Sequence, residues 1–264
     1  MQTLGKTAMT KLQFFAAGAS LAALLSAGAA AAQEQDYSWT GFYAGVNLGG
    51  AWGKASNHVT ASSGTGAVTI PPGDITTING IGTNNSNALR FTGGGEAGYN
   101  YQSGHLLLGL ETDFDAFQVK QIKSTTFNSA LLINPPVTYT IGQKVTTDWL
   151  WTIRPRIGYA AGRWLVYGTA GMAMTPITLL TTYSDTLLPP NAASIAVNKT
   201  KTGWTAGLGG AYAFTPHLSI KAEWLYSDFG TVQGSATTAS GYASFVTQAS
   251  VKANLVRMGV DYRF

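Results

Sequence analysis

The closing stretch Leu255-Val256-Arg257-Met258-Gly259-Val260-Asp261-Tyr262-Arg263-Phe264 alternates apolar and polar side chains. Because successive side chains of a β-strand point to opposite faces, it predicts a strand with one apolar face and one charged face. The charged face carries Arg257, Asp261 and Arg263. A chain that ends on such a strand indicates hydrocarbon on one side and a polar interior on the other, as in a transmembrane β-barrel.

Seven further segments repeat this alternation, so the sequence predicts eight strands. With 255–264, they span residues 42–52, 89–101, 106–116, 149–159, 164–174, 204–214 and 218–226. The faces of 164–174 are ambiguous because neither carries a charge. We predict an all-β fold, namely an eight-stranded antiparallel up-and-down transmembrane β-barrel.

Twelve charged residues in these segments all fall on the face opposite the apolar one. They are Arg90, Glu96, Glu111, Asp113, Asp115, Arg154, Arg156, Lys221, Glu223, Arg257, Asp261 and Arg263. A lipid-facing Lys or Arg near the bilayer midplane costs about 2–4 kcal/mol, which explains their absence from the apolar face. An eight-stranded barrel is barely wide enough for its own side chains, so we expect these charges to pair and plug the lumen.

The connections between the predicted strands alternate in length. Three are tight turns, at 102–104, 161–163 and 215–217. Four are long, at 54–87, 120–147, 175–199 and 230–250. Short periplasmic turns and long extracellular loops place both termini in the periplasm. A ten-stranded barrel remains an alternative if residues 54–87 contain another hairpin.

Aromatic residues cluster near both ends of the predicted strands. The expected girdle comprises Phe42, Trp52, Tyr99, Tyr101, Trp149, Tyr159, Trp164, Trp204, Phe214 and Trp224, with Phe114, Tyr262 and Phe264 at the same levels. Trp and Tyr prefer the two membrane–water interfaces, so this distribution agrees with the predicted orientation.

The first 32 residues are predicted to be a cleaved secretory signal peptide. Lys6 and Lys11 precede an apolar run at 12–25, which is shorter than the roughly 20 residues of a spanning helix. Small residues at 26–32 then offer a cleavage site, which leaves residues 33–264 as one outer-membrane β-barrel domain. The mature chain would have 14 basic and 12 acidic residues, so its charge gives little reason to expect a nucleic-acid partner. The absence of cysteine excludes thiol catalysis and cysteine-ligated metals.

Three segments carry a family resemblance. They are residues 39–45 (Trp-Thr-Gly-Phe-Tyr-Ala-Gly) with Gly49-Gly50, residues 221–226 (Lys-Ala-Glu-Trp-Leu-Tyr) with Asp228-Phe229-Gly230, and residues 254–264. Together they resemble the alphaproteobacterial outer-membrane β-barrel family of opacity-like and porin-like surface proteins. The resemblance implies location in the outer membrane, surrounded by lipid and lipopolysaccharide. It also implies that the barrel-assembly machinery binds the C-terminal strand, with Tyr262 and Phe264 as the assembly signal.

Several motifs suggest other chemistry and are better explained structurally. Gly93-x-Gly95-x-x-Gly98 matches a dinucleotide-binding fingerprint but lies inside a predicted strand, where close packing explains it. His58, His105 and His217 fall in one long loop and two turns, so they do not converge on a metal or heme. We therefore assign no catalytic, cofactor-binding or metal-binding residues.

Three functions are compatible with this sequence. The first is a non-enzymatic structural envelope protein that presents four extracellular loops above a plugged lumen. The second is a small porin-like diffusion channel, in which the internal charges line a water path. The third is a surface adhesin or heme-binding receptor with its ligand site in the loops.

Overall fold

The computed structural model describes residues 37–64, 70–81, 84–118, 120–129, 136–187, 190–241 and 243–264. The predicted signal peptide, residues 1–32, lies outside the described residues. The elements are β1 (Gly41–Ser63), α2 (Pro72–Ile81), β2 (Asn84–Ser103), β3 (Leu106–Phe117), β4 (Lys120–Asn128), β5 (Thr138–Thr146), β6 (Trp149–Ala161), β7 (Trp164–Asp185), β8 (Ala192–Ala213), β9 (Leu218–Thr237) and β10 (Ala243–Arg263). No helix among these residues is long and apolar enough to cross a membrane.

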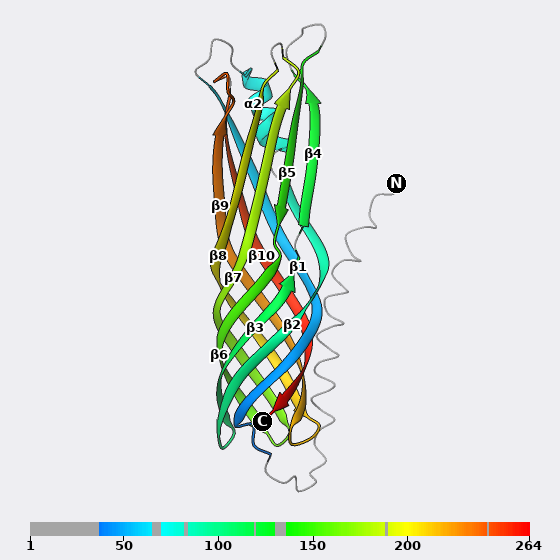
Figure 1. The fold of residues 1–264 in the computed structure, drawn as a ribbon, viewed down its shortest axis with the longest axis vertical. Helices are drawn as coiled ribbons and strands as arrows, with labels where there is room; N and C mark the ends of the chain where they lie inside the picture. The colour runs from blue at the N-terminus through cyan, green and yellow to red at the C-terminus, as the bar shows by residue number, and fades with distance from the viewer. Residues whose placement is uncertain are drawn as a thin grey trace, which may run out of the picture. The chain divides into compact units, whose positions relative to one another are not determined.

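Eight strands close into an antiparallel ring, which forms the lower half of the barrel in Figure 1. Around the ring the pairs are β1–β2, β2–β3, β3–β6, β6–β7, β7–β8, β8–β9, β9–β10 and β10–β1. Closure leaves no unpaired strand edge at membrane depth, where an unsatisfied backbone group costs several kcal/mol. The predicted eight-stranded up-and-down barrel is therefore confirmed.

The faces of the ring follow the predicted alternation. On β10, Val256, Met258 and Val260 are exposed on the outside, whereas Arg257 and Asp261 are buried inside. The strand with ambiguous faces, β7, buries Tyr167 in the interior. The outward side chains thus form an apolar band that suits hydrocarbon.

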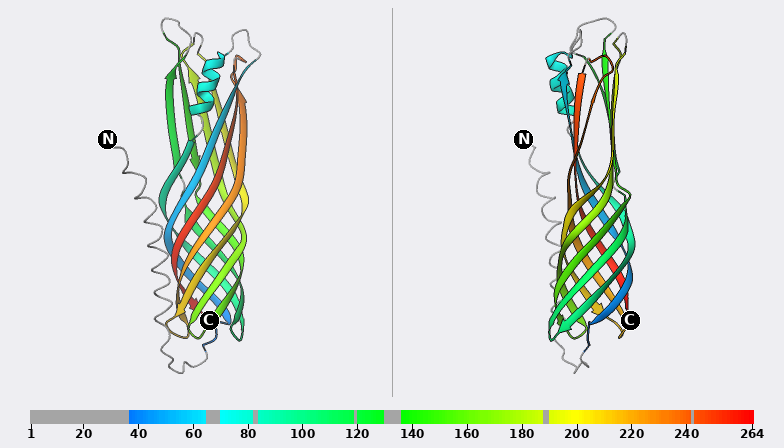
Figure 2. Two further views of the ribbon diagram at one scale, coloured as in Figure 1. Left: turned by 180° about the vertical axis from the view of Figure 1, so that it is seen from behind. Right: turned by 60° about the vertical axis from the view of Figure 1, so that its left-hand side comes forward.

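Above the ring, the wall separates into two four-stranded sheets that face each other. The first contains the upper parts of β2, β1, β10 and β9, and the second contains β4, β5 and the upper parts of β7 and β8. The right-hand view of Figure 2 shows these two layers. We call this part the sandwich.

The change from ring to sandwich takes place at irregular points in the strands. Between Ser250 and Lys252 the β9–β10 register shifts, and Gly230, opposite the shift, adopts a φ of 66°, which favours glycine. The last β8–β9 pair, Trp204 with Asp228, lies directly below this point. The strands are also interrupted between β3 and β4 and between β5 and β6. These two interruptions lie side by side, because Phe117 N–H donates a hydrogen bond to Asp148 O at 3.0 Å.

The sandwich has an apolar core. It is formed by Val59, Ala61, Ile70, Ile78, Val137, Tyr139, Ile141, Tyr183, Ile195, Ala243 and Phe245. Helix α2 contributes Ile78, and its Asn79 Oδ1 accepts a hydrogen bond from Ala61 N–H at 2.8 Å. Because β2 pairs with β1 only up to Asn57, this bond covers part of the free edge of β1.

Two expectations need correction here. Three of the four connections predicted as long loops, 120–147, 175–199 and 230–250, consist largely of strand, because their inward residues bury an apolar core that alternation can supply. A further hairpin was suspected in residues 54–87, which instead contain α2 and strand ends. The additional strands are β4 and β5, which continue β3 and β6 upward and lie outside the closed ring.

Candidate functional site

The interior of the ring holds a network of ion pairs centred on β3. Arg154 Nη2 lies 2.6 Å from Glu111 Oε1 and 2.7 Å from Asp113 Oδ2, and its Nη1 lies 3.2 Å from Glu223 Oε1. Both Arg154 and its partners are almost completely buried. Since β6 and β9 are three strands apart around the ring, the Arg154–Glu223 pair crosses the lumen.

A second arginine, Arg257 on β10, joins three carboxylates. Its Nη1 lies 2.6 Å from Asp115 Oδ2 and 3.1 Å from Asp113 Oδ1, and its Nη2 lies 2.8 Å from Glu223 Oε2. Charge-assisted hydrogen bonds of this length are roughly twice as strong as neutral ones. Arg257 therefore ties β10 to β3 across the interior.

The remaining cations lie closer to the lower turns. Lys221 Nζ is 2.7 Å from Glu111 Oε2 and 2.9 Å from Glu96 Oε2, and it connects β9 to strands on the opposite wall. Arg156 Nη1 is 3.0 Å from Glu111 Oε2, and its Nε donates to Asn100 Oδ1 at 2.9 Å. Glu111 thus accepts from three cations and forms the hub of the network.

Ten of the twelve predicted lumen residues are buried inside the ring, and two are not. Arg90 is exposed because β2 pairs with β3 only as far as Thr92, so residue 90 no longer faces a closed ring. Arg263 is half-buried at the last residue of β10, where its Nη2 donates to Pro216 O at 2.7 Å. For Arg90 the expected lumen position is wrong, whereas Arg263 keeps the inward face, opposite the inward Tyr43, and lies at the rim of the ring.

Uncharged groups complete the network. Tyr43 Oη donates to Glu111 at 2.7 Å, Thr152 Oγ1 to Asp113 at 2.6 Å, and Tyr167 Oη to Glu223 at 3.3 Å. Tyr43 and Thr152 share the inward parity of the charged residues, so the same alternation could have identified them. Tyr167 lies in segment 164–174, where neither face carries a charge. Alternation therefore did not predict which side of the sheet Tyr167 faces.

The glycine-rich segment of β2 serves close packing. A Cβ on Gly98 would collide with the hydroxyl of Tyr43, and a Cβ on Gly94 would collide with Phe114 O. Glycine therefore lets the large Tyr43 ring lie across β2 and reach Glu111. This agrees with the structural explanation of the Gly93-x-Gly95-x-x-Gly98 motif.

Apolar side chains fill the interior above the charges. The cluster comprises Ala51, Phe117, Val145, Leu150, Ala173, Ile177, Leu179, Leu225, Phe229, Val232, Ala249, Val251, Ala253 and Leu255. Higher still, Thr181 and Thr247 share a hydrogen bond of 3.1 Å between the two sheets, below the sandwich core. Charged, apolar, hydroxyl and again apolar layers thus follow one another through the described interior.

The predicted girdle residues lie on the outward faces of their strands. Phe42, Trp52, Tyr99, Tyr101, Tyr159, Trp164, Trp204, Phe214 and Trp224 are exposed, and Trp149 is half-buried. Neighbours stack in pairs, including Phe42 with Tyr99 at 4.7 Å and Phe114 with Trp149 at 5.6 Å between ring centroids. Such side chains suit the interface between hydrocarbon and headgroups.

The three histidines lie apart, as predicted. His105 Nδ1 is 2.9 Å from Ala160 O, and its ring stacks on Tyr159. His217 Nδ1 is 2.8 Å from Arg263 O, and its ring stacks on Tyr262, whereas His58 is exposed on β1 in the sandwich. In the described part of the chain, no group of three or more His, Cys, Asp or Glu side chains could hold a metal ion.

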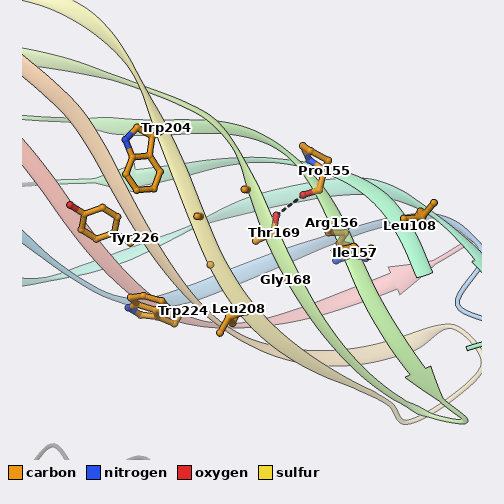
Figure 3. A pocket seen from close by; sticks show the side chains of 13 residues that line it. Leu108, Pro155, Arg156, Ile157, Gly168, Thr169, Trp204, Leu208, Trp224 and Tyr226 are labelled. Carbon is orange, nitrogen blue, oxygen red and sulfur yellow. Dashed lines mark hydrogen bonds between the residues drawn. The ribbon is translucent and has the colours of Figure 1, made fainter. Parts of the chain in front are cut away.

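The outside of the ring carries a groove of about 710 Å³ across β6, β7, β8 and β9 (Figure 3). Trp204, Trp224 and Tyr226 gather at one end of it, and Leu108 lies at the other. It is lined by Leu108, Pro155, Arg156, Ile157, Gly168, Thr169, Ala170, Trp204, Ala206, Gly207, Leu208, Trp224 and Tyr226. Its volume falls within the roughly 300–1,000 Å³ of small-molecule sites.

A proline interrupts the wall inside this groove. Pro155 has no N–H, and the β6–β7 pairing is missing between Ile153–Met172 and Arg156–Thr169. Thr169 Oγ1 donates to Pro155 O at 3.0 Å, which Figure 3 shows as a dashed line. The hydroxyl thereby satisfies a backbone carbonyl that faces the interrupted part of the ladder.

Comparison with known proteins agrees with this architecture. Residues 19–264 match the family model of the outer membrane protein beta-barrel domain. The chain is 31% identical over 236 residues to the 31 kDa outer-membrane immunogenic protein of Brucella melitensis biotype 1, covering 89% of this chain and 87% of that protein. It is 24% identical to the 22 kDa outer membrane protein of Rhizobium leguminosarum bv. viciae, covering 63% of each.

Two solved structures were also matched. Neisserial surface protein A has a TM-score of 0.35 at 15% identity, covering 85% of this chain and 98% of that one. The outer membrane protease OmpT of Escherichia coli has a TM-score of 0.38 at 10% identity, and the match covers 88% of this chain and 99% of that one. On the family match and the Brucella relative, this outer-membrane protein belongs to the alphaproteobacterial outer-membrane β-barrel family.

Proposed function

We propose that this protein is a non-enzymatic structural component of the outer membrane, in which a plugged barrel anchors a rigid sandwich outside the cell. The observation that carries the proposal is the continuous filling of the interior. The ten charged side chains within the ring are each at most 6% exposed, and apolar side chains bury the space above them. A diffusion channel would need a water path through these layers.

The buried charges also argue against catalysis. A catalytic group must touch its substrate, and Glu111, Asp113 and Arg154 are bonded to one another out of reach of solvent. A network in which Arg154, Lys221 and Arg257 each meet several carboxylates instead braces opposite walls of the ring. We infer a mechanical role for it.

The proposed orientation places both termini in the periplasm. The chain enters β1 and leaves β10 at the same end of the ring, where Phe264 N–H donates to Phe42 O at 3.0 Å. The tight turns lie at this end, and the long hairpins extend from the other. The assembly role of Tyr262 and Phe264 and an extracellular ligand at the predicted loops both stay predictions.

Single-channel recording tests the plugged lumen. Protein isolated from outer membranes is inserted into planar bilayers, with insertion verified by flotation of vesicles from the same preparation. We expect no stepwise current from inserted protein. Reproducible current steps would refute the plug and favour the channel hypothesis.

Labelling of intact cells tests the orientation. A membrane-impermeant amine reagent should modify the exposed Lys144 and Lys199 of the sandwich. An epitope attached after a short linker to Phe264 should bind antibody only after the outer membrane is permeabilised. Antibody binding to intact cells would reverse the proposed orientation.

A further inference from the structure

The segments above the ring carry an excess of positive charge. Residues 53–91, 118–148, 175–203 and 228–252 contain eight lysines and arginines but four aspartates and no glutamate. Asp74 and Asp185 are buried, and Asp228 accepts from Lys252 Nζ at 3.0 Å. In the described part of these segments, Asp148 is therefore the one acid that is exposed and outside an ion pair.

Four of these cations gather where β4 begins. Lys120 and Lys144 lie on the outer face of the sheet, and the β4–β5 register makes them diagonal neighbours, roughly 7–8 Å apart. Lys123 and Arg90 occupy inward positions but are exposed, because β4 and the upper part of β2 have no strand partner on that side. Arg90 and Lys120 follow the last β2–β3 pair by two and three residues, so they flank the point where the two sheets separate.

We call Arg90, Lys120, Lys123 and Lys144 the cationic patch. None of the four makes an ion pair with a described residue. The strand that carries two of them, β4, is the outermost strand on the right of the upper part in Figure 1. The patch is therefore open to a ligand from the side of the sandwich.

A buried amide lies beside the patch. Gln121 is 6% exposed and faces the interior next to Val145, and neither its Oε1 nor its Nε2 bonds to a protein group. Buried polar side chains almost always have a hydrogen-bond partner, so this amide indicates a bound group. Gln121 stands between Lys120 and Lys123 on the edge strand, so its Nε2–H can donate to an anion that these lysines attract.

We propose that the cationic patch and Gln121 bind a soluble polyanion, namely a polymer that carries sulfate or phosphate groups. Neighbouring charges of one sign repel one another, and a ligand with several anionic groups relieves this repulsion. The patch runs from the outer face around the edge of β4 to an inward position, so a chain of repeated charges fits it better than a single ion. This inference goes beyond the proposed structural role and rests on its orientation for placing the patch outside the cell.

The height of the patch favours a soluble ligand over a lipid headgroup. Trp149 belongs to the aromatic girdle, and Lys144 lies five residues away from it on the sandwich side. At about 3.3 Å per residue, Lys144 stands roughly 15 Å above Trp149 along the strands. The headgroup layer on each side of a bilayer is only about 5–8 Å thick. The phosphates of neighbouring lipids therefore lie below Lys144.

Binding of a charged polymer tests the patch. The full protein in phosphatidylcholine nanodiscs is titrated against fluorescent dextran sulfate, with uncharged dextran as the control probe, and binding is followed by fluorescence anisotropy. We expect dextran sulfate alone to bind, with an affinity that falls as salt is added. Lys120→Gln/Lys144→Gln should weaken binding about tenfold, because each exposed charge pair contributes a factor of a few.

Two other lysines supply the matched control. Lys199→Gln/Lys201→Gln removes the same charge from β8, at the opposite edge of the same sheet, and should bind dextran sulfate almost as tightly as wild type. Equal weakening in both double variants would mean that net charge attracts the polymer, and the site would be lost. Unboiled gel mobility verifies that each variant is folded.

The buried amide and the source of the anion are tested with the same probe. Gln121→Leu keeps the charge but should weaken binding at high salt as well, since salt screens a buried hydrogen bond little. Unchanged affinity would remove Gln121 from the site. Lipid A added to the nanodiscs should leave binding intact, whereas loss of binding would assign the patch to lipid phosphates. These results do not depend on conductance, so their failure leaves the plugged barrel to be judged separately.

Discussion

The interiors of the ring and of the sandwich share strands β1, β2, β7, β8, β9 and β10 but have opposite chemistry. On β10 the inward positions are Asp261 and Arg257 in the ring, and Phe245 in the sandwich. On β7 the buried Tyr167 contacts the charged network, whereas Tyr183 contacts apolar side chains of the sandwich core. One alternating pattern thus serves two environments along a single strand.

The surroundings explain this difference. Within hydrocarbon, burying an apolar side chain gains little, because the membrane is as apolar as a protein core. The ring is therefore held by closed backbone pairing and by internal ion pairs that satisfy one another. Outside the membrane the hydrophobic effect returns, and the sandwich buries apolar surface like a soluble β-sandwich.

The largest effect is expected from breaking the ring network. Arg154→Ala removes one of the two arginines that Glu111, Asp113 and Glu223 share and leaves excess negative charge in a buried site, which should lower the free energy of unfolding by about 3–5 kcal/mol. Urea unfolding of the protein in lipid vesicles, followed by tryptophan fluorescence, measures this change. Arg90→Ala, at an exposed arginine, should behave like wild type. Equal stability of both variants would mean that the network contributes nothing.

A smaller and local effect is expected in the sandwich. Ile195→Ala removes a buried side chain from its core, which should lower local stability by roughly 2–5 kcal/mol. Because the ring has its own interactions, we expect faster amide hydrogen exchange in the upper parts of β7 and β10 and unchanged exchange in the ring. The exposed neighbour Ser194→Ala is the control. Faster exchange throughout the ring would show that the two regions unfold together.

The smallest effect concerns the edge of the sandwich. Asn79→Ala removes the acceptor of the 2.8 Å bond from Ala61 N–H, with an expected loss of about 1 kcal/mol. The exchange rate of the Ala61 amide should rise, and α2 should become more sensitive to protease. Thr77→Ala, whose hydroxyl bonds within α2 to Gly73 O, should leave the Ala61 amide protected. An unchanged Ala61 amide in Asn79→Ala would remove α2 as the cover of this edge.

Much of the ring follows from local alternation. The face of Arg154, Arg257 or Val256 is decided by its position in a period of two, and hydrocarbon permits only one assignment. The same reasoning misplaced Arg90, because a parity states which side a residue faces but not where the ring stops being closed. The ion-pair partners of Glu111 could not be predicted from alternation either, because Lys221 and Arg156 approach it from different strands.

By itself, the sequence determined the strand pattern, the apolar outer band, the charged inner face and the outer-membrane family, because each depends on periodicity or on short motifs. Only the tertiary structure decided that the long connections form a sandwich, that Tyr43 and Tyr167 complete the network, and that small residues on β7 and β8 create a lipid-facing groove. These features depend on register and on contacts between strands far apart in the chain. Local alternation does not specify these contacts, because the alternating pattern is the same for every register that keeps apolar side chains outside.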